Sequence, residues 1–74
     1  MEKVLIFKTG VESKQEVERV FEIFNGMHSI KQWNVDLDDS DRILRIACVD
    51  ISPEFIEDLF EFEGIYCENM AYNL

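Results

Sequence analysis

The chain contains few of the residues that interrupt regular structure. One Pro and three Gly among 74 residues argue against a loop-rich or disordered chain. No apolar run approaches the roughly 18 residues that a membrane span needs, and no Gly-rich loop could cradle a phosphate. Only two cysteines are present, Cys48 and Cys67, and their wide spacing is not that of a metal-binding pair.

Basic residues are also scarce. Seven Lys and Arg stand against sixteen Asp and Glu, which gives a net charge of −9. Such a surface repels phosphate backbones and anionic lipids, so nucleic acids and membranes are not expected as partners. A basic patch on a protein would be attracted through faster encounter. The plainer interpretation is that the acidity keeps the chain in solution.

Apolar residues are plentiful by contrast. Hydrophobic residues make up 47% of the chain, and six Phe, two Tyr and one Trp are among them. We therefore expect residues 1–74 to form a single domain with its own core, without a disulfide or a cofactor. A predicted strand follows Met1 almost at once and no basic-then-apolar signal is present, so the expected location is the cytoplasm.

The pattern of apolar residues predicts six elements. The predicted strands cover residues 3–9, 31–37, 42–49 and 66–72, where β-branched and aromatic residues are frequent. One helix is predicted from Ser13 to about Phe24, with Val17, Val20, Phe21 and Phe24 on its apolar face. A second helix starts at Ser52-Pro53-Glu54, ends at Gly64 and carries Phe55, Ile56, Leu59, Phe60 and Phe62.

The order of these elements, βαββαβ, predicts an α+β ferredoxin-like sandwich. In that fold a four-stranded antiparallel sheet carries both helices on one face, because the crossovers are right-handed. The strands of Cys48 and Cys67 would then be separated by a third strand, at about 9.5 Å. This distance is too long for a disulfide, so we expect both thiols to be reduced and buried.

The segment Thr9–Glu16, between the first strand and the first helix, resembles a known metal-binding loop. Heavy-metal-associated domains of copper chaperones and metal-pumping ATPases have a hydrophobic residue and Cys-x-x-Cys at this place. Val11 stands in the hydrophobic position here, while Ser13 and Glu16 stand in the two cysteine positions. The spacing of Val17, Val20 and Ile23-Phe24, the segments 33–36 and 42–46, and Gly64-Ile65-Tyr66 add further similarity.

The resemblance implies soft-metal delivery, but the loop lacks the ligands for that function. Copper(I) transfer needs two thiolates, whereas Ser13 offers a hydroxyl and Glu16 a hard carboxylate oxygen. The pattern Ser-x-x-Glu instead predicts a capping box. In it, the Ser13 side chain accepts from the Glu16 N–H and the Glu16 carboxylate accepts from the Ser13 N–H.

Two other metal sites can be considered. A carrier could use ligands outside the family pattern, namely Glu16, Met27, His28 or Cys67, although a lone His beside a loop is more often a surface residue. The acidic turn Asp36, Asp38, Asp39 and Asp41 suggests calcium. It fails the EF-hand pattern because the glycine position holds Asp41, so a hairpin turn is the simpler interpretation.

No set of residues indicates catalysis, because a nucleophile, a base and an oxyanion donor are not combined. The sequence therefore predicts a metal-free relative of the family that binds a protein or acts as an accessory module. Its predicted contact residues are Val11, Glu12, Ile65 and Tyr66. The open sheet face with Val4 and Ile6 could form a homodimer, and the acids Glu54, Glu57, Asp58, Glu61 and Glu63 form either a solvated face or an acidic docking surface.

Overall fold

A computed structural model describes residues 1–70 of the chain. It contains strands β1 (Glu2–Thr9), β2 (Ile30–Val35), β3 (Leu44–Val49) and β4 (Cys67–Asn69) and helices α1 (Lys14–Phe24) and α2 (Pro53–Phe62), in the order βαββαβ. None of the helices in this part of the chain is long and apolar enough to cross a membrane.

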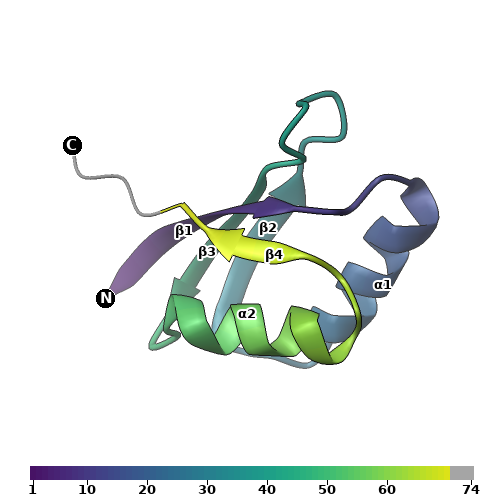
Figure 1. Cartoon of the computed structure of the whole chain (residues 1–74). Coiled ribbons are helices and arrows are strands. Elements are labelled where there is room, and N and C mark those ends of the chain that lie inside the picture. Colours follow the sequence, from purple (N-terminus) through teal and green to yellow (C-terminus); the bar gives the residue numbers. More distant parts are fainter. Residues whose placement is uncertain (71–74) are drawn as a thin grey trace.

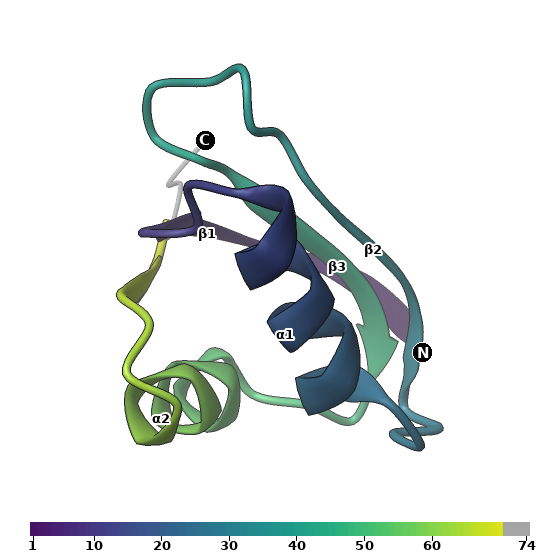
Figure 2. The ribbon, with the colours of Figure 1, turned by 90° about the vertical axis from the view of Figure 1, so that its right-hand side faces the viewer.

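The strands form one antiparallel sheet in the order β2-β3-β1-β4. Both helices cover the same face of this sheet, and the other face is open (Figures 1 and 2). The predicted ferredoxin-like sandwich is therefore confirmed. β1 separates the strands of Cys48 and Cys67, and both thiols are free.

The core lies between the sheet and the helices. Its buried residues are Phe7, Val11, Val20, Phe24, Leu44, Ile46, Cys48, Ile51, Ile56, Phe60 and Ile65. Phe24 makes an edge-on contact with Trp33 at 5.5 Å between ring centroids, and its ring lies 5.8 Å from that of Phe60. These rings join α1, α2 and β2, which is the aromatic centre of the packing.

The apolar faces of both helices are narrower than the sequence predicts. Phe21 on α1 and Phe55 and Phe62 on α2 are exposed. A helix of this length buries only the stripe that faces the sheet, so the residues at the borders of the predicted stripe remain in solvent.

The predicted ends of the elements differ most in the strands. At the hairpin, β2 ends two residues earlier than predicted, at Val35, and β3 begins two residues later, at Leu44. The reason is that Asp36, Asp39 and Arg42 form the backbone hydrogen bonds of the turn. β4 is limited to Cys67–Asn69, and the end of the predicted strand 66–72 lies outside the described residues. The two helices match their predicted starts, with Ser13 and Ser52 as N-caps.

Candidate functional site

Ser13 and Glu16, the residues at the two expected cysteine positions, both bind backbone amides. The Ser13 Oγ accepts from the Glu16 N–H at 3.2 Å, as the capping pattern predicts. The Glu16 carboxylate accepts from the Glu12 N–H at 2.9 Å, not from the Ser13 N–H. The carboxylate therefore closes a loop that is one residue wider than the predicted capping box. It also lies at the positive end of the helix dipole.

The buried Thr9 ties this loop to the hairpin between β2 and β3. Its Oγ1 donates to the Arg42 carbonyl at 2.7 Å and accepts from the Val11 N–H at 3.2 Å. The Thr9 N–H donates to the Asp41 carbonyl at 3.2 Å. One hydroxyl therefore satisfies the Val11 N–H of the loop and the Arg42 carbonyl of the hairpin. These bonds hold the loop in place without an ion.

Gly10 brings the loop against the start of β4. Its N–H donates to the Tyr66 carbonyl at 2.9 Å. A Cβ added at Gly10 would lie 3.3 Å from the Tyr66 Cβ, which is tight enough to force the neighbour to move. The absence of a side chain at Gly10 thus permits the close approach of the two backbones.

The four predicted contact residues divide into two groups. Val11 is 0% exposed and Ile65 is 4% exposed, so both are core residues. Their side chains fix the loop and are not available to a partner. Glu12 and Tyr66 are exposed and are the two side chains of this set that a partner could reach.

Tyr66 is held by its neighbour on the last strand. The phenol donates to the Glu68 carboxylate at 2.8 Å. This hydrogen bond, together with the negative charge of Glu68, favours the protonated phenol and raises the pKa of Tyr66 above its usual value of 10.0. Tyr66 is therefore neutral at physiological pH and offers an aromatic ring beside a carboxylate.

The donor set of this loop does not fit a soft metal. Ser13 supplies a neutral hydroxyl and Glu16 one hard carboxylate, and both already accept hydrogen bonds from amides. Copper(I) prefers thiolate sulfur. Across residues 1–70, no group of three or more His, Cys, Asp and Glu is arranged to hold an ion.

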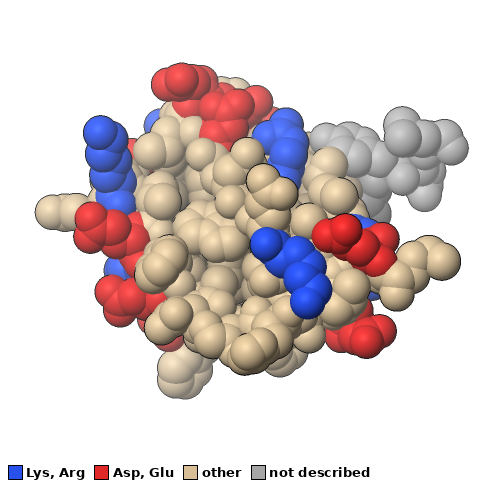
Figure 3. All heavy atoms as spheres, turned by 180° about the vertical axis from the view of Figure 1, so that it is seen from behind, with Lys and Arg blue, Asp and Glu red and all other residues tan. Residues whose placement is uncertain are grey.

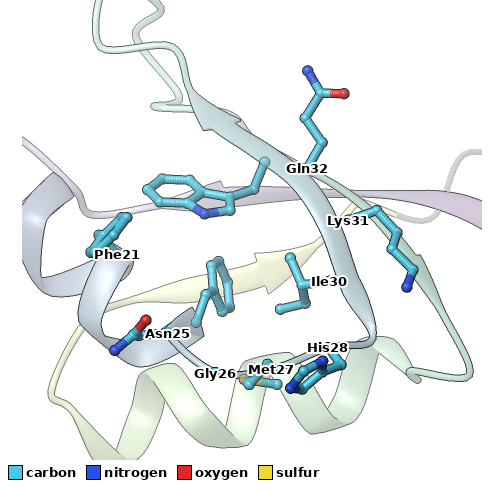
Figure 4. A pocket seen from close by; sticks show the side chains of 10 residues that line it. Phe21, Asn25, Gly26, Met27, His28, Ile30, Lys31 and Gln32 are labelled. Atoms are coloured by element: carbon cyan, nitrogen blue, oxygen red, sulfur yellow. The ribbon is translucent and has the colours of Figure 1, made fainter.

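The other ligand candidates are not brought together. Met27 and His28 line a hollow at the carboxyl end of α1 (Figure 4), whereas Cys67 lines a different hollow between α2 and β4. Burial, with a smaller contribution from Glu57, raises the pKa of the Cys67 thiol to about 12. Since the thiolate is the species that binds metal, Cys67 is a poor ligand at neutral pH.

The acidic turn is organised by its own backbone. The carboxylates of Asp36 and Asp39 accept from the N–H groups of Asp38 and Asp41 at 3.0 and 2.7 Å, and Asp41 pairs with Lys8 at 3.7 Å. Such Asx turns are common hairpin devices. The structure therefore supports the interpretation as a turn.

Two of the five acids on and after α2 have structural roles. The Glu57 carboxylate accepts from the Asn69 N–H at 2.8 Å, which fixes β4 to the helix. Glu63 forms an ion pair with Arg19 of α1 at 3.1 Å. Glu54, Asp58 and Glu61 are exposed, so only these three remain for the solvated face or docking surface expected from the sequence.

Replacing Ser13 by Ala tests the importance of the cap. We expect a loss of about 1 kcal/mol in the free energy of unfolding, because the Glu16 N–H loses its acceptor. Urea denaturation followed by circular dichroism measures this change. Ser52→Ala is the matched control, since Ser52 caps α2 through the Phe55 N–H at the same 3.2 Å distance. A Ser13→Ala variant as stable as the parent would contradict the capping role.

Comparison with solved structures gives an informative similarity. The chain is similar to the apo form of the heavy-metal-associated domain of the copper chaperone for superoxide dismutase, with a TM-score of 0.78 and 15% sequence identity. The similarity covers 96% of this chain and 69% of that one. No family model and no curated protein matches the sequence. At this identity the similarity establishes a shared fold.

Proposed function

We propose that this chain is a metal-free relative of the heavy-metal-associated domains and acts as a cytoplasmic protein-binding or accessory module. In this proposal residues 1–74 are a single non-enzymatic domain, and Ser13 and Glu16 replace the two cysteines of the family. In this proposal the protein functions without a bound metal, because the polar side chains at these positions accept hydrogen bonds from the backbone of the loop.

The observation that carries the proposal is the pair of hydrogen bonds that the Ser13 Oγ and the Glu16 carboxylate accept from backbone amides. A metal site would need these oxygens free and would need softer donors for copper. The same bonds support a loop without a metal, since Ser13 pairs the Glu16 N–H that the helix start otherwise leaves unpaired and Glu16 pairs the Glu12 N–H that precedes the cap.

The protein-binding role is supported by the side chains exposed beside the loop. Glu12 and Tyr66 are exposed while their neighbours Val11 and Ile65 anchor the backbone in the core. An aromatic ring on a well-fixed backbone loses little conformational freedom on binding, and Tyr is frequent among residues that dominate interfaces.

A metal titration tests the first part of the proposal. Calorimetry of the full chain with Cu(I) and Zn(II), under reducing conditions, is expected to show no binding at micromolar or lower dissociation constants. Binding at or below the micromolar range that disappears in Glu16→Ala would overturn the metal-free loop. It would favour a carrier with unusual ligands.

Site-specific crosslinking tests the second part. A photoreactive phenylalanine analogue at position 66 is expected to capture one specific protein or a second copy of the chain. The same analogue at position 62 is the matched control, because Phe62 is also an exposed aromatic residue, at 87% exposure. Equal capture from both positions, or none from position 66 together with a monomer in light scattering, would contradict the proposed contact surface.

A further inference from the structure

Acidic residues are unevenly distributed over this molecule. The chain has sixteen Asp and Glu among 74 residues, yet the stretch from residue 25 to residue 35 has none. This stretch includes all of β2, an edge strand of the sheet. Figure 3 views the side on which β2 lies: a basic side chain lies near the middle of this side, and most of the acidic side chains lie toward its margins.

Hollows without acidic residues flank β2 on both faces of the sheet. On the helix side, an open hollow of about 510 Å³ is lined by aromatic and apolar residues that include Phe21, Met27 and Trp33. Figure 4 shows Met27, His28 and Ile30 along this hollow, with Lys31 on the strand above it. On the open sheet face, a smaller hollow of about 200 Å³ is lined by Val4, Asn34 and Arg45, among others.

Two basic side chains accompany the strand. Lys31 and Arg45 are exposed, and neither forms an ion pair with any residue of the described part of the chain. Two other basic residues near the sheet are different in this respect, since Lys8 pairs with Asp41 and Arg42 binds carbonyls of the hairpin. Lys3 on β1 is also exposed and forms no ion pair with a described residue. Lys31 and Arg45 therefore supply positive charge that is not neutralised locally.

One edge of β2 has backbone hydrogen-bonding groups that no other described strand pairs. Within residues 1–70, β2 pairs only with β3. The Asp36 N–H donates to the Ile43 carbonyl, and bonded and non-bonded pairs alternate along an antiparallel ladder. The register places Trp33 and Val35 at the non-bonded pairs, so their N–H and C=O groups point away from β3 toward the free edge.

We propose that the edge of β2 binds an extended acidic segment of a partner protein as an added strand. The partner's backbone pairs with the free groups of Trp33 and Val35, as in other complexes formed by strand addition. One apolar side chain of the segment enters the hollow beside Trp33, and its carboxylates lie near Lys31 and Arg45. This surface differs from the loop surface of Glu12 and Tyr66.

Charge decides between this occupant and the alternatives. A basic segment would gain nothing from Lys31 and Arg45 and would meet acids only at the margins of the face. A second copy joined through the same strand would bring two acid-free, basic edges together without opposite charges. An acidic extended segment satisfies both the backbone groups and the local charge.

A peptide titration tests the proposal. The probes are a decapeptide of alternating glutamate and valine and a matched decapeptide of alternating lysine and valine. We expect the acidic peptide to bind saturably below about 1 mM and to change the fluorescence of Trp33, the single Trp of the chain. It should also slow amide hydrogen exchange at Trp33 and Val35 about tenfold or more.

Charge reversal gives the matched controls. Lys31→Glu is expected to weaken binding of the acidic peptide about tenfold, and the same change at Lys14, an exposed residue at the start of α1, is expected to leave it unchanged. Circular dichroism checks that both variants fold. Tighter binding of the lysine peptide, equal binding by Lys31→Glu and the parent, or unchanged exchange at Trp33 and Val35 would each overturn the proposal.

This inference extends the proposed protein-binding role to a second surface, and the two can fail separately. Metal binding at Glu16 would end the metal-free interpretation and leave the edge of β2 unaffected. Conversely, a failed peptide titration would leave the loop surface of Tyr66 as the contact site.

Discussion

Phe60→Ala is expected to lower the free energy of unfolding by about 3–5 kcal/mol. The Phe60 side chain is 0% exposed, and its ring packs 5.8 Å from that of Phe24 between the two helices. Truncation removes buried apolar surface and leaves a cavity. A domain of this size has only about 5–10 kcal/mol of stability, so a large part of the variant should be unfolded at modest urea concentrations. Urea denaturation followed by circular dichroism measures the effect.

Phe62→Ala provides the control on the same helix. Phe62 is 87% exposed although the sequence places it among the apolar residues of α2, so its removal should change stability by less than about 0.5 kcal/mol. Similar losses in the two variants would mean that the packing described for α2 is incorrect.

The double variant Ser13→Cys/Glu16→Cys is expected to bind Cu(I) at least about a thousandfold more tightly than the parent chain. Two thiols would then stand three positions apart at the start of α1. The positive end of the helix dipole lowers thiol pKa values there and favours the thiolates that bind copper. Competition with a chromophoric Cu(I) chelator, under anaerobic reducing conditions, measures the affinity.

Two further variants separate the thiols from other effects of the change. Ser13→Ala/Glu16→Ala removes the same hydrogen bonds without adding sulfur and should not bind copper. Ser52→Cys/Phe55→Cys places the same spacing at the start of α2, which is also capped by serine, but outside the loop that resembles the metal site. A folded Ser13→Cys/Glu16→Cys variant that binds no more copper than either control would contradict the proposal that positions 13 and 16 correspond to the cysteine positions of the family.

The fold could be predicted because its signals are local. Ser13 and Ser52 mark the helix starts through caps, and Pro53 reinforces the second. The alternation of Leu44, Ile46 and Cys48 identifies the buried face of β3. What the pattern could not supply is the width of each helix stripe. Phe21 and Phe62 fit a helical period but lie at its borders, where exposure depends on how far the sheet extends beneath the helix.

The candidate site was predicted only in part, for a related reason. The bond between Ser13 and Glu16 spans one helical turn, so the sequence pattern is sufficient to predict it. The hydrogen bond from Thr9 to the Arg42 carbonyl joins residues 33 positions apart. Sequence patterns predict hydrogen bonds only between residues that are close in the chain. The burial of Val11 also depends on the final packing of the loop, which explains why a residue expected at the surface is part of the core.

The threonine hydroxyl that links the loop and the hairpin has a consequence for the environments in which this end of the molecule keeps its shape. Thr9 neither ionises nor oxidises under physiological conditions, and the groups it binds are backbone atoms. The loop, the hairpin and the neighbouring Gly10–Tyr66 contact are therefore joined by groups that change neither charge nor oxidation state across the physiological range of pH and redox conditions.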